Sequence, residues 1–115
     1  MKNAYLGYAK AICMPDHASA NCRILTDYEG NTFLLSYSTI VCVVRTDGWM
    51  HCNGLYSRTT IKHIGWFMRY ISAQFGTKVS YYDAKWCYEH DSMMNVTNGE
   101  VLTYEEFDEK ENQTA

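Results

Sequence analysis

One continuous stretch, residues 32–75, constrains the fold more than any other part of this 115-residue chain. It reads TFLLSYSTIVCVVRTDGWMHCNGLYSRTTIKHIGWFMRYISAQF: two apolar runs, an Asp-Gly turn, a third apolar segment and then a helical pattern. β-Branched residues favour strands, and Asp-Gly is a strong hairpin signal. The stretch therefore predicts an α+β fold, in which an antiparallel sheet of about five or six strands carries one main amphipathic helix on one face.

The main helix is expected from about residue 58 to residue 75. Ser57 or Thr59 is suited to cap its first amides, and Gly76 suits the left-handed residue that often ends a helix. Apolar residues recur at helical spacing and predict the buried stripe: Ile61, Ile64, Phe67 or Met68, Ile71 and Phe75. Ile64 is expected to be almost completely buried.

Strands and turns are expected around this helix. Five segments have strand composition: residues 5–14, 22–28, 32–37, 38–45 and 49–53. Turns are expected where Pro, Gly, Asp and Asn gather, at 14–16, 29–31 and 46–48. Residues 78–82 are also expected to be a strand, and residues 83–89 are ambiguous between a helical turn and a strand. Asn98-Gly99 predicts a last hairpin within 93–103.

The formal charge of −3 is concentrated near the C-terminus. Residues 105–115 hold five acidic residues and Lys110, a net charge of −4, so the rest of the chain carries +1. We expect a single domain over residues 1–104 and a flexible acidic tail over 105–115. The tail has only Phe107 to bury, which gives little to offset the entropy of ordering it. The alternative is a segment that engages a basic partner or mimics phosphates.

Five cysteines and four histidines raise the question of a metal site or disulfides. The closest pairs, Cys13 with His17 and Cys87 with His90, are isolated and differ in spacing, whereas structural zinc uses four ligands in short paired spacings. The first ten residues lack the apolar stretch of a signal peptide, and no apolar run is long enough to span a membrane. We expect no metal, disulfide or other cofactor, and free thiols in the cytoplasm of a bacterial cell.

No catalytic constellation is visible in the sequence. His51 and Cys52 are adjacent, but neighbouring residues of a strand point to opposite faces. A distant pair such as Cys42 with His63 does not follow from spacing. Glycine-rich phosphate loops and nucleophile elbows are absent. We therefore expect a protein that is not an enzyme, and we assign no catalytic residue.

Two groups of residues are candidates for a binding surface. Ten tyrosines are many for this length, and interfaces favour Tyr and Trp; the densest aromatic group follows the main helix and comprises Tyr81, Tyr82, Trp86 and Tyr88. The helix itself carries cations that its period aligns for nucleic-acid backbone: Arg58, Lys62 and Arg69. Packing at the edges of the helix and sheet is the alternative for the aromatic group, and a solvated helix face is the alternative for the cations.

The central stretch resembles a small uncharacterised domain family of bacteria, phages and plasmids. The shared strand motif is Ser-Tyr-x-Thr-x-Val, here Ser36, Tyr37, Thr39 and Val41. The second motif is Gly-x-Tyr-Ser-x-Thr-Thr-x-x-His-Ile-x-x-Phe, here Gly54, Tyr56, Ser57, Thr59, Thr60, His63, Ile64 and Phe67. The resemblance implies a mobile-element origin and no known activity, cofactor or site residue. Within the motif, Thr60 and His63 either hydrogen-bond the sheet or line a recognition site.

These observations favour a non-enzymatic interaction protein of a phage or mobile element. Its expected partner is a host protein or ribonucleoprotein complex, which it would inhibit as anti-CRISPR proteins inhibit theirs, with Tyr81, Tyr82, Trp86 and Tyr88 as the contact. The alternative is a small nucleic-acid-binding accessory protein that uses Arg58, Lys62 and Arg69. The sequence does not settle the oligomeric state.

Overall fold

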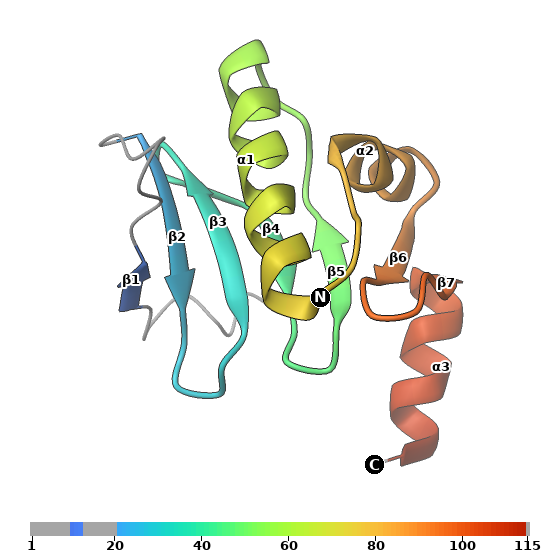
Figure 1. Ribbon diagram of the computed structural model, residues 1–115. Helices are drawn as coiled ribbons and strands as arrows, with labels where there is room; N and C mark the ends of the chain where they lie inside the picture. The colour runs from blue at the N-terminus through green and yellow to red at the C-terminus, as the bar shows by residue number, and fades with distance from the viewer. Residues whose placement is uncertain (1–9, 13–20, 115) are drawn as a thin grey trace.

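The computed structural model describes residues 10–12 and 21–114. The described chain forms one sheet and three helices (Figure 1). The strands are β1 (Lys10–Ile12), β2 (Cys22–Thr26), β3 (Thr32–Ser36), β4 (Thr39–Val44), β5 (Trp49–Cys52), β6 (Ser92–Asn95) and β7 (Val101–Thr103). The helices are α1 (Arg58–Phe75), α2 (Tyr81–Glu89) and α3 (Tyr104–Thr114). The expected turn at residues 14–16 lies outside the described residues, as does most of the expected strand at 5–14.

The strands pair in sequence order from β1 to β7, and every pair is antiparallel. This confirms the α+β class, with seven strands in the described sheet where about five or six were expected. The predicted turns between β2 and β3, β4 and β5, and β6 and β7 are also present. At the second of them Gly48 has φ of 97°, and a Cβ there would lie 2.6 Å from the Asn95 side-chain oxygen. A larger residue would therefore separate this turn from β6.

Helix α1 has the bounds that its caps predict. The Ser57 hydroxyl accepts a hydrogen bond from the Thr60 amide at 3.2 Å, and Gly76 ends the helix with φ of 66°. Ile64, Phe67 and Ile71 are completely buried, which confirms the centre of the predicted stripe, whereas Ile61 is only half-buried. The helix packs on β3 and β4 (Figure 1).

The prediction of a strand at residues 78–82 is wrong. Helix α2 begins within that segment, at Tyr81. Val79, Tyr81 and Tyr82 have high strand propensity, but the Ser80 amide donates to the Asp83 carboxylate at 2.8 Å and starts a helix there. Ala84 and Cys87 then turn inward and are completely buried. The ambiguous segment 83–89 is the remainder of this helix.

Two apolar clusters lie on opposite faces of the sheet, because successive strand residues alternate between faces. Met50 joins the cluster under α1 and α2, together with Ile64 and Cys87. Its neighbour Trp49 packs on the reverse face with Met93 and Phe107. The two helices between β5 and β6 therefore cover one face, and α3 covers part of the other.

The C-terminal segment differs from the flexible tail expected over 105–115. Residues 104–114 form α3, and the Phe107 ring meets Trp49 edge to face with centroids 5.4 Å apart. Thr103 and Glu106 form a reciprocal capping box, with N···O distances of 2.9 and 3.1 Å. Arg45 adds an ion pair to Glu111. The buried Phe107 ring, the partly buried Tyr104, a helix cap and two ion pairs, Arg45 with Glu111 and Lys110 with Glu100, thus place a segment that has no periodic apolar stripe.

None of the helices in the described part of the chain is long and apolar enough to span a membrane.

The buried stripe of α1 gives a first test. Ile64→Ala leaves a cavity between α1 and the sheet and should lower the free energy of unfolding by roughly 2–5 kcal/mol. Ile61→Ala, at the half-buried position three residues before it, should cost clearly less. Urea unfolding of both variants measures the difference. Equal losses in the free energy of unfolding would contradict the structure, in which Ile64 faces the sheet and Ile61 is only half-buried.

The docking of α3 gives a second test. Phe107→Ala should lower the free energy of unfolding by roughly 3 kcal/mol, because it removes the ring between Trp49 and Met93. Glu105→Ala, on the exposed side of the same helix, should change it by no more than about 0.5 kcal/mol. If thermal melts of the two variants coincide, the C-terminal segment is the undocked tail that its composition suggested.

Candidate functional site

A buried polar network joins the start of α1 to the end of β3. Ser36 Oγ lies 2.8 Å from His63 Nδ1 and 3.3 Å from Thr60 Oγ1, and Thr60 Oγ1 lies 3.2 Å from Ser57 Oγ. Ser36, Thr60 and His63 are each less than 5% exposed. The two polar residues of the helical motif therefore hydrogen-bond the sheet, which is the first of the two roles considered for them.

His63 is held as a neutral ring. Burial lowers its pKa below the usual 6.5, and no carboxylate hydrogen-bonds it among the described residues. The Tyr37 and Trp66 rings lie beside it, with centroids 6.0 and 5.4 Å away. Ser36 and His63 have the atoms of a nucleophile and its base, but they are only 2% and 3% exposed and leave no room for a substrate. The network thus serves to position α1.

Two tyrosines next to this network have strained backbones and exposed rings. Tyr37 and Tyr56 have φ of 56° and 55°, values that are unusual for a bulky side chain. Their side chains are 51% and 63% exposed. A Cβ on Gly54 would lie 3.0 Å from the Tyr56 ring, so this glycine makes room for the ring. The structure places most of the Tyr56 side chain in solvent.

Three buried thiols meet beneath α2. Cys42 and Cys52 are directly opposed in the β4–β5 register, and Cys87 comes from α2. The hydrogen bond with Cys52, and then burial, raise the pKa of Cys42; burial raises that of Cys87 to about 12. The raised pKa values keep Cys42 and Cys87 as neutral thiols, which are poor nucleophiles, whereas the hydrogen bond with Cys42 lowers the pKa of Cys52. In the described ranges, no three His, Cys, Asp or Glu side chains are grouped to hold a metal ion, and Cys13 lies outside those ranges.

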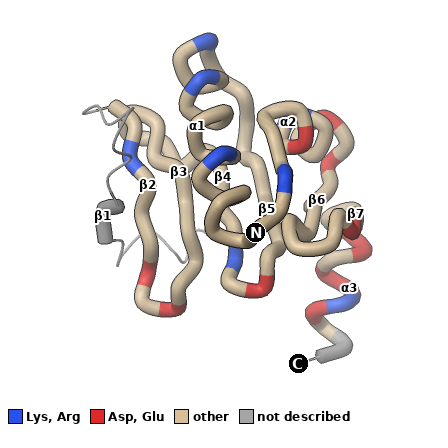
Figure 2. Tube along the Cα trace, viewed as in Figure 1, with Lys and Arg blue, Asp and Glu red and all other residues tan. Residues whose placement is uncertain are grey.

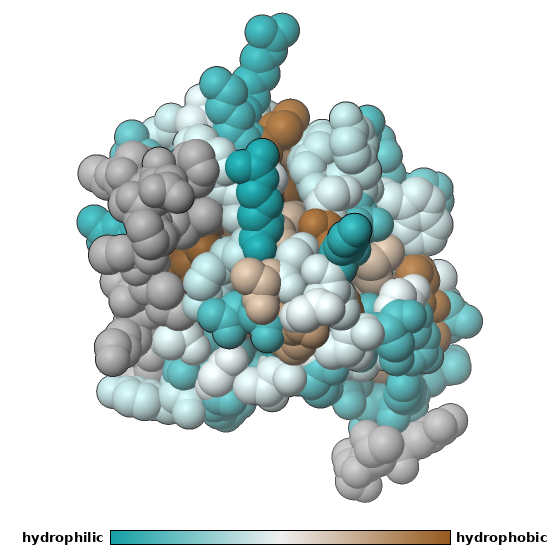
Figure 3. Space-filling view, in the orientation of Figure 1, coloured by the Kyte–Doolittle hydropathy of each residue, from teal (hydrophilic) through white to brown (hydrophobic). Residues whose placement is uncertain are grey.

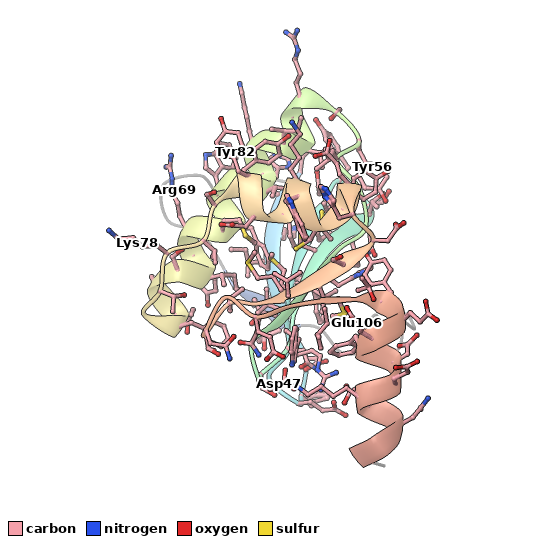
Figure 4. The ribbon with its side chains drawn as sticks, turned by 90° about the vertical axis from the view of Figure 1, so that its right-hand side faces the viewer. Asp47, Tyr56, Arg69, Lys78, Tyr82 and Glu106 are labelled. Carbon is pink, nitrogen blue, oxygen red and sulfur yellow. The ribbon has the colours of Figure 1, made fainter. Side chains whose placement is uncertain are left out.

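The aromatic residues predicted as a contact lie on α2. Tyr82, Trp86 and Tyr88 are 74%, 42% and 43% exposed, whereas Tyr81 is half-buried and packs against the core. The Trp86 ring stacks on His90 with centroids 4.1 Å apart, which holds the indole in place. We call Tyr81, Tyr82, Trp86 and Tyr88 the α2 aromatic surface. At about 100° per residue, Tyr82 and Trp86 share one side of the helix, whereas Tyr88 lies about 160° around it from Trp86. In Figure 4, Tyr82 and Tyr56 lie towards opposite ends of this helix.

The basic residues of α1 are all exposed and follow its outer side, and we call Arg58, Lys62 and Arg69 the α1 basic stripe. Figure 2 shows lysine and arginine along α1, while acidic residues lie at the hairpin tips, on α2 and on α3. The stripe and the α2 aromatic surface belong to neighbouring helices that cover the same face of the sheet.

One hollow was not predicted from the sequence. It measures about 360 Å³ and lies between the α1–α2 connection and the β6–β7 turn. Lys78 and Asp83 line one side, and Met94 and Asn98 line the other. No local motif marks it, because it forms only where two segments distant in the sequence meet.

Residues 9–86 match a family of unknown function, DUF8033. The chain belongs to that family. The matched DUF8033 region contains the buried network, the α1 basic stripe and all of the α2 aromatic surface except Tyr88. Strands β6 and β7 and helix α3 follow it. Neither the curated proteins nor the solved structures contain a match to this chain.

The depressed pKa of His63 gives a prediction with a definite sign. The unfolded state binds a proton near pH 6.5 that the folded state binds only at lower pH, so the folded state loses stability as pH falls below about 6.5. His63→Phe removes this term and leaves all other titrations in place. The stability advantage of the parent over His63→Phe should therefore shrink between about pH 7.5 and pH 5.5 in urea unfolding. A pH-independent difference would contradict the assignment.

Proposed function

We propose that the protein is a non-enzymatic interaction protein of a phage or mobile element, which binds and inhibits a host defence complex as anti-CRISPR proteins do. The observation that supports binding is the α2 aromatic surface: three large aromatic side chains on a nine-residue helix are 42–74% exposed. Interface hot spots favour Tyr and Trp, because they bury a large area with few rotatable bonds.

The support beneath α2 makes this surface suitable for binding. Ala84 and Cys87 are completely buried under the helix, and the Val79 amide donates to Ser72 Oγ at 3.0 Å, which ties the connection to α1. A helix that is already held in place loses little entropy when a partner binds it. The α2 aromatic surface is thus presented in a fixed arrangement.

The proposed partner is a host protein or ribonucleoprotein complex in the bacterial cytoplasm. The mobile-element origin rests on the resemblance of the central motifs to a family of bacteria, phages and plasmids. Inhibition by binding needs no turnover, which agrees with the burial of the Ser36–His63 pair.

The second candidate is a nucleic-acid-binding accessory protein that uses the α1 basic stripe. One observation favours it: Arg58, Lys62 and Arg69 form no ion pair with any described residue. The two candidates differ in their response to salt, because phosphate contacts weaken steeply as salt rises and an aromatic protein interface does not.

Affinity capture from host lysate followed by mass spectrometry identifies the partner, and titration calorimetry then tests the surface. The double variant Tyr82→Ala with Trp86→Ala should weaken binding by at least about 2 kcal/mol, roughly thirty-fold in Kd. Tyr28→Ala is the control, since Tyr28 is 89% exposed on the distant β2–β3 turn. Between about 50 and 200 mM salt the Kd of the parent should change little.

A steep salt dependence with no effect of the two aromatic substitutions would contradict the proposal. It would favour the nucleic-acid candidate. If a captured partner binds the double variant as tightly as the parent, the α2 aromatic surface is not its binding site.

A further inference from the structure

The outer side of α1 carries a glycine, Gly65, that no contact within the described structure requires. Gly65 lies between Lys62 and Arg69 on the outward stripe, and a Cβ built on it would meet no atom within 4 Å. Glycine in a helix interior is destabilising relative to alanine. Packing within the protein therefore does not require a glycine at this position, and it does not compensate for the helix stability that the glycine costs.

The same side of α1 has uncompensated positive charge. From Gly48 to Tyr82 the chain contains no Asp or Glu. Arg58, Lys62, Arg69 and Lys78 are exposed, and none of them forms an ion pair within the described part of the chain. Figure 3 shows hydrophilic side chains projecting over this face, and Figure 4 places Lys78 on the same side as Arg69.

Among the described residues, no large apolar side chain on this surface is fully exposed, and the neighbouring Trp66 is partly buried against the core. The large hydrophobic side chains that are exposed in the described residues lie on other elements, and the exposed residues of α1 are polar, charged or small. A protein partner usually needs an aromatic or aliphatic hot spot, whereas a phosphodiester backbone needs only cations and access. The charge and the lack of a fully exposed apolar side chain thus favour nucleic acid over an acidic protein.

We propose that the outer face of α1 binds the phosphodiester backbone of a nucleic acid, with Arg58, Lys62 and Arg69 contacting phosphates and Gly65 leaving room for the backbone to approach. Binding here is independent of base sequence, because backbone contacts carry no sequence information. The surface is distinct from the α2 aromatic surface and adds a second binding function to it.

Fluorescence anisotropy with a fluorescein-labelled 20-nucleotide DNA, as duplex and as single strand, tests this surface. Three phosphate contacts give a slope of about −2.7 in log affinity against log salt for the duplex, so affinity should fall roughly forty-fold between about 50 and 200 mM salt. Arg58→Gln, Lys62→Gln and Arg69→Gln should each reduce the slope by about one. Arg23→Gln is the control, because Arg23 is exposed on β2 and points to the opposite face.

A substitution of Gly65 tests whether this residue serves binding or the stability of the helix. Gly65→Leu should raise the melting temperature, because leucine is the better helix former, yet weaken DNA binding several-fold by blocking the approach. The double variant Tyr82→Ala with Trp86→Ala should bind DNA as the parent does, so this proposal and the protein-binding proposal fail separately.

Three results would overturn the proposal: no binding of either DNA at about 50 mM salt, an effect of Arg23→Gln equal to that of the stripe variants, or full DNA affinity in Gly65→Leu. Loss of a protein partner in the stripe variants without DNA binding by the parent would also overturn it, and would assign the stripe to an acidic protein.

Discussion

The buried hydrogen bond between Ser36 and His63 is the constraint on which the arrangement of the outer surfaces depends. It joins the last residue of β3 to the second turn of α1 at 2.8 Å, away from solvent. A buried group left without its partner costs about 1–3 kcal/mol, so rotation of α1 that breaks this bond is disfavoured. With His63 fixed inward, the helical period turns Lys62 and Arg69 outward. A polar pair in the core thus determines which side of α1 meets a partner.

Two helices on one face of the sheet then present different chemistry. α2 offers aromatic area from Tyr82, Trp86 and Tyr88, while α1 offers cations and a bare glycine with no aromatic side chain fully exposed. Acidic residues lie off α1, at the hairpin tips, on and just after α2, and on α3 (Figure 2). A near-neutral body can in this way carry a locally basic surface that its net charge does not reveal. The α1 basic stripe and most of the α2 aromatic surface lie within the DUF8033 match.

Short sequence motifs predicted the elements whose ends depend on neighbouring residues. Ser57, the apolar stripe and Gly76 marked both ends of α1, and Asp-Gly and Asn-Gly marked two hairpins. Helix α2 was missed because Val79, Tyr81 and Tyr82 favour strands, although Ser80 and Asp83 already had capping-box spacing. α3 was missed for lack of a periodic stripe, although Thr103 and Glu106 had the same spacing. The Ser36–His63 contact joins residues far apart in the sequence, and only the two family motifs that contain them, one for each residue, pointed to them.

A double-mutant cycle on Ser36→Ala and His63→Phe tests the central constraint most directly. Ser36→Ala leaves His63 Nδ1 without its partner, and His63→Phe leaves Ser36 Oγ with only its 3.3 Å contact to Thr60 Oγ1, whereas the double variant removes both members of the pair. Urea unfolding should show that the double variant loses less stability than the sum of the two single variants, by about 1–3 kcal/mol. Losses that add to within about 0.5 kcal/mol would show that the two residues do not act as a pair, and that some other contact orients α1.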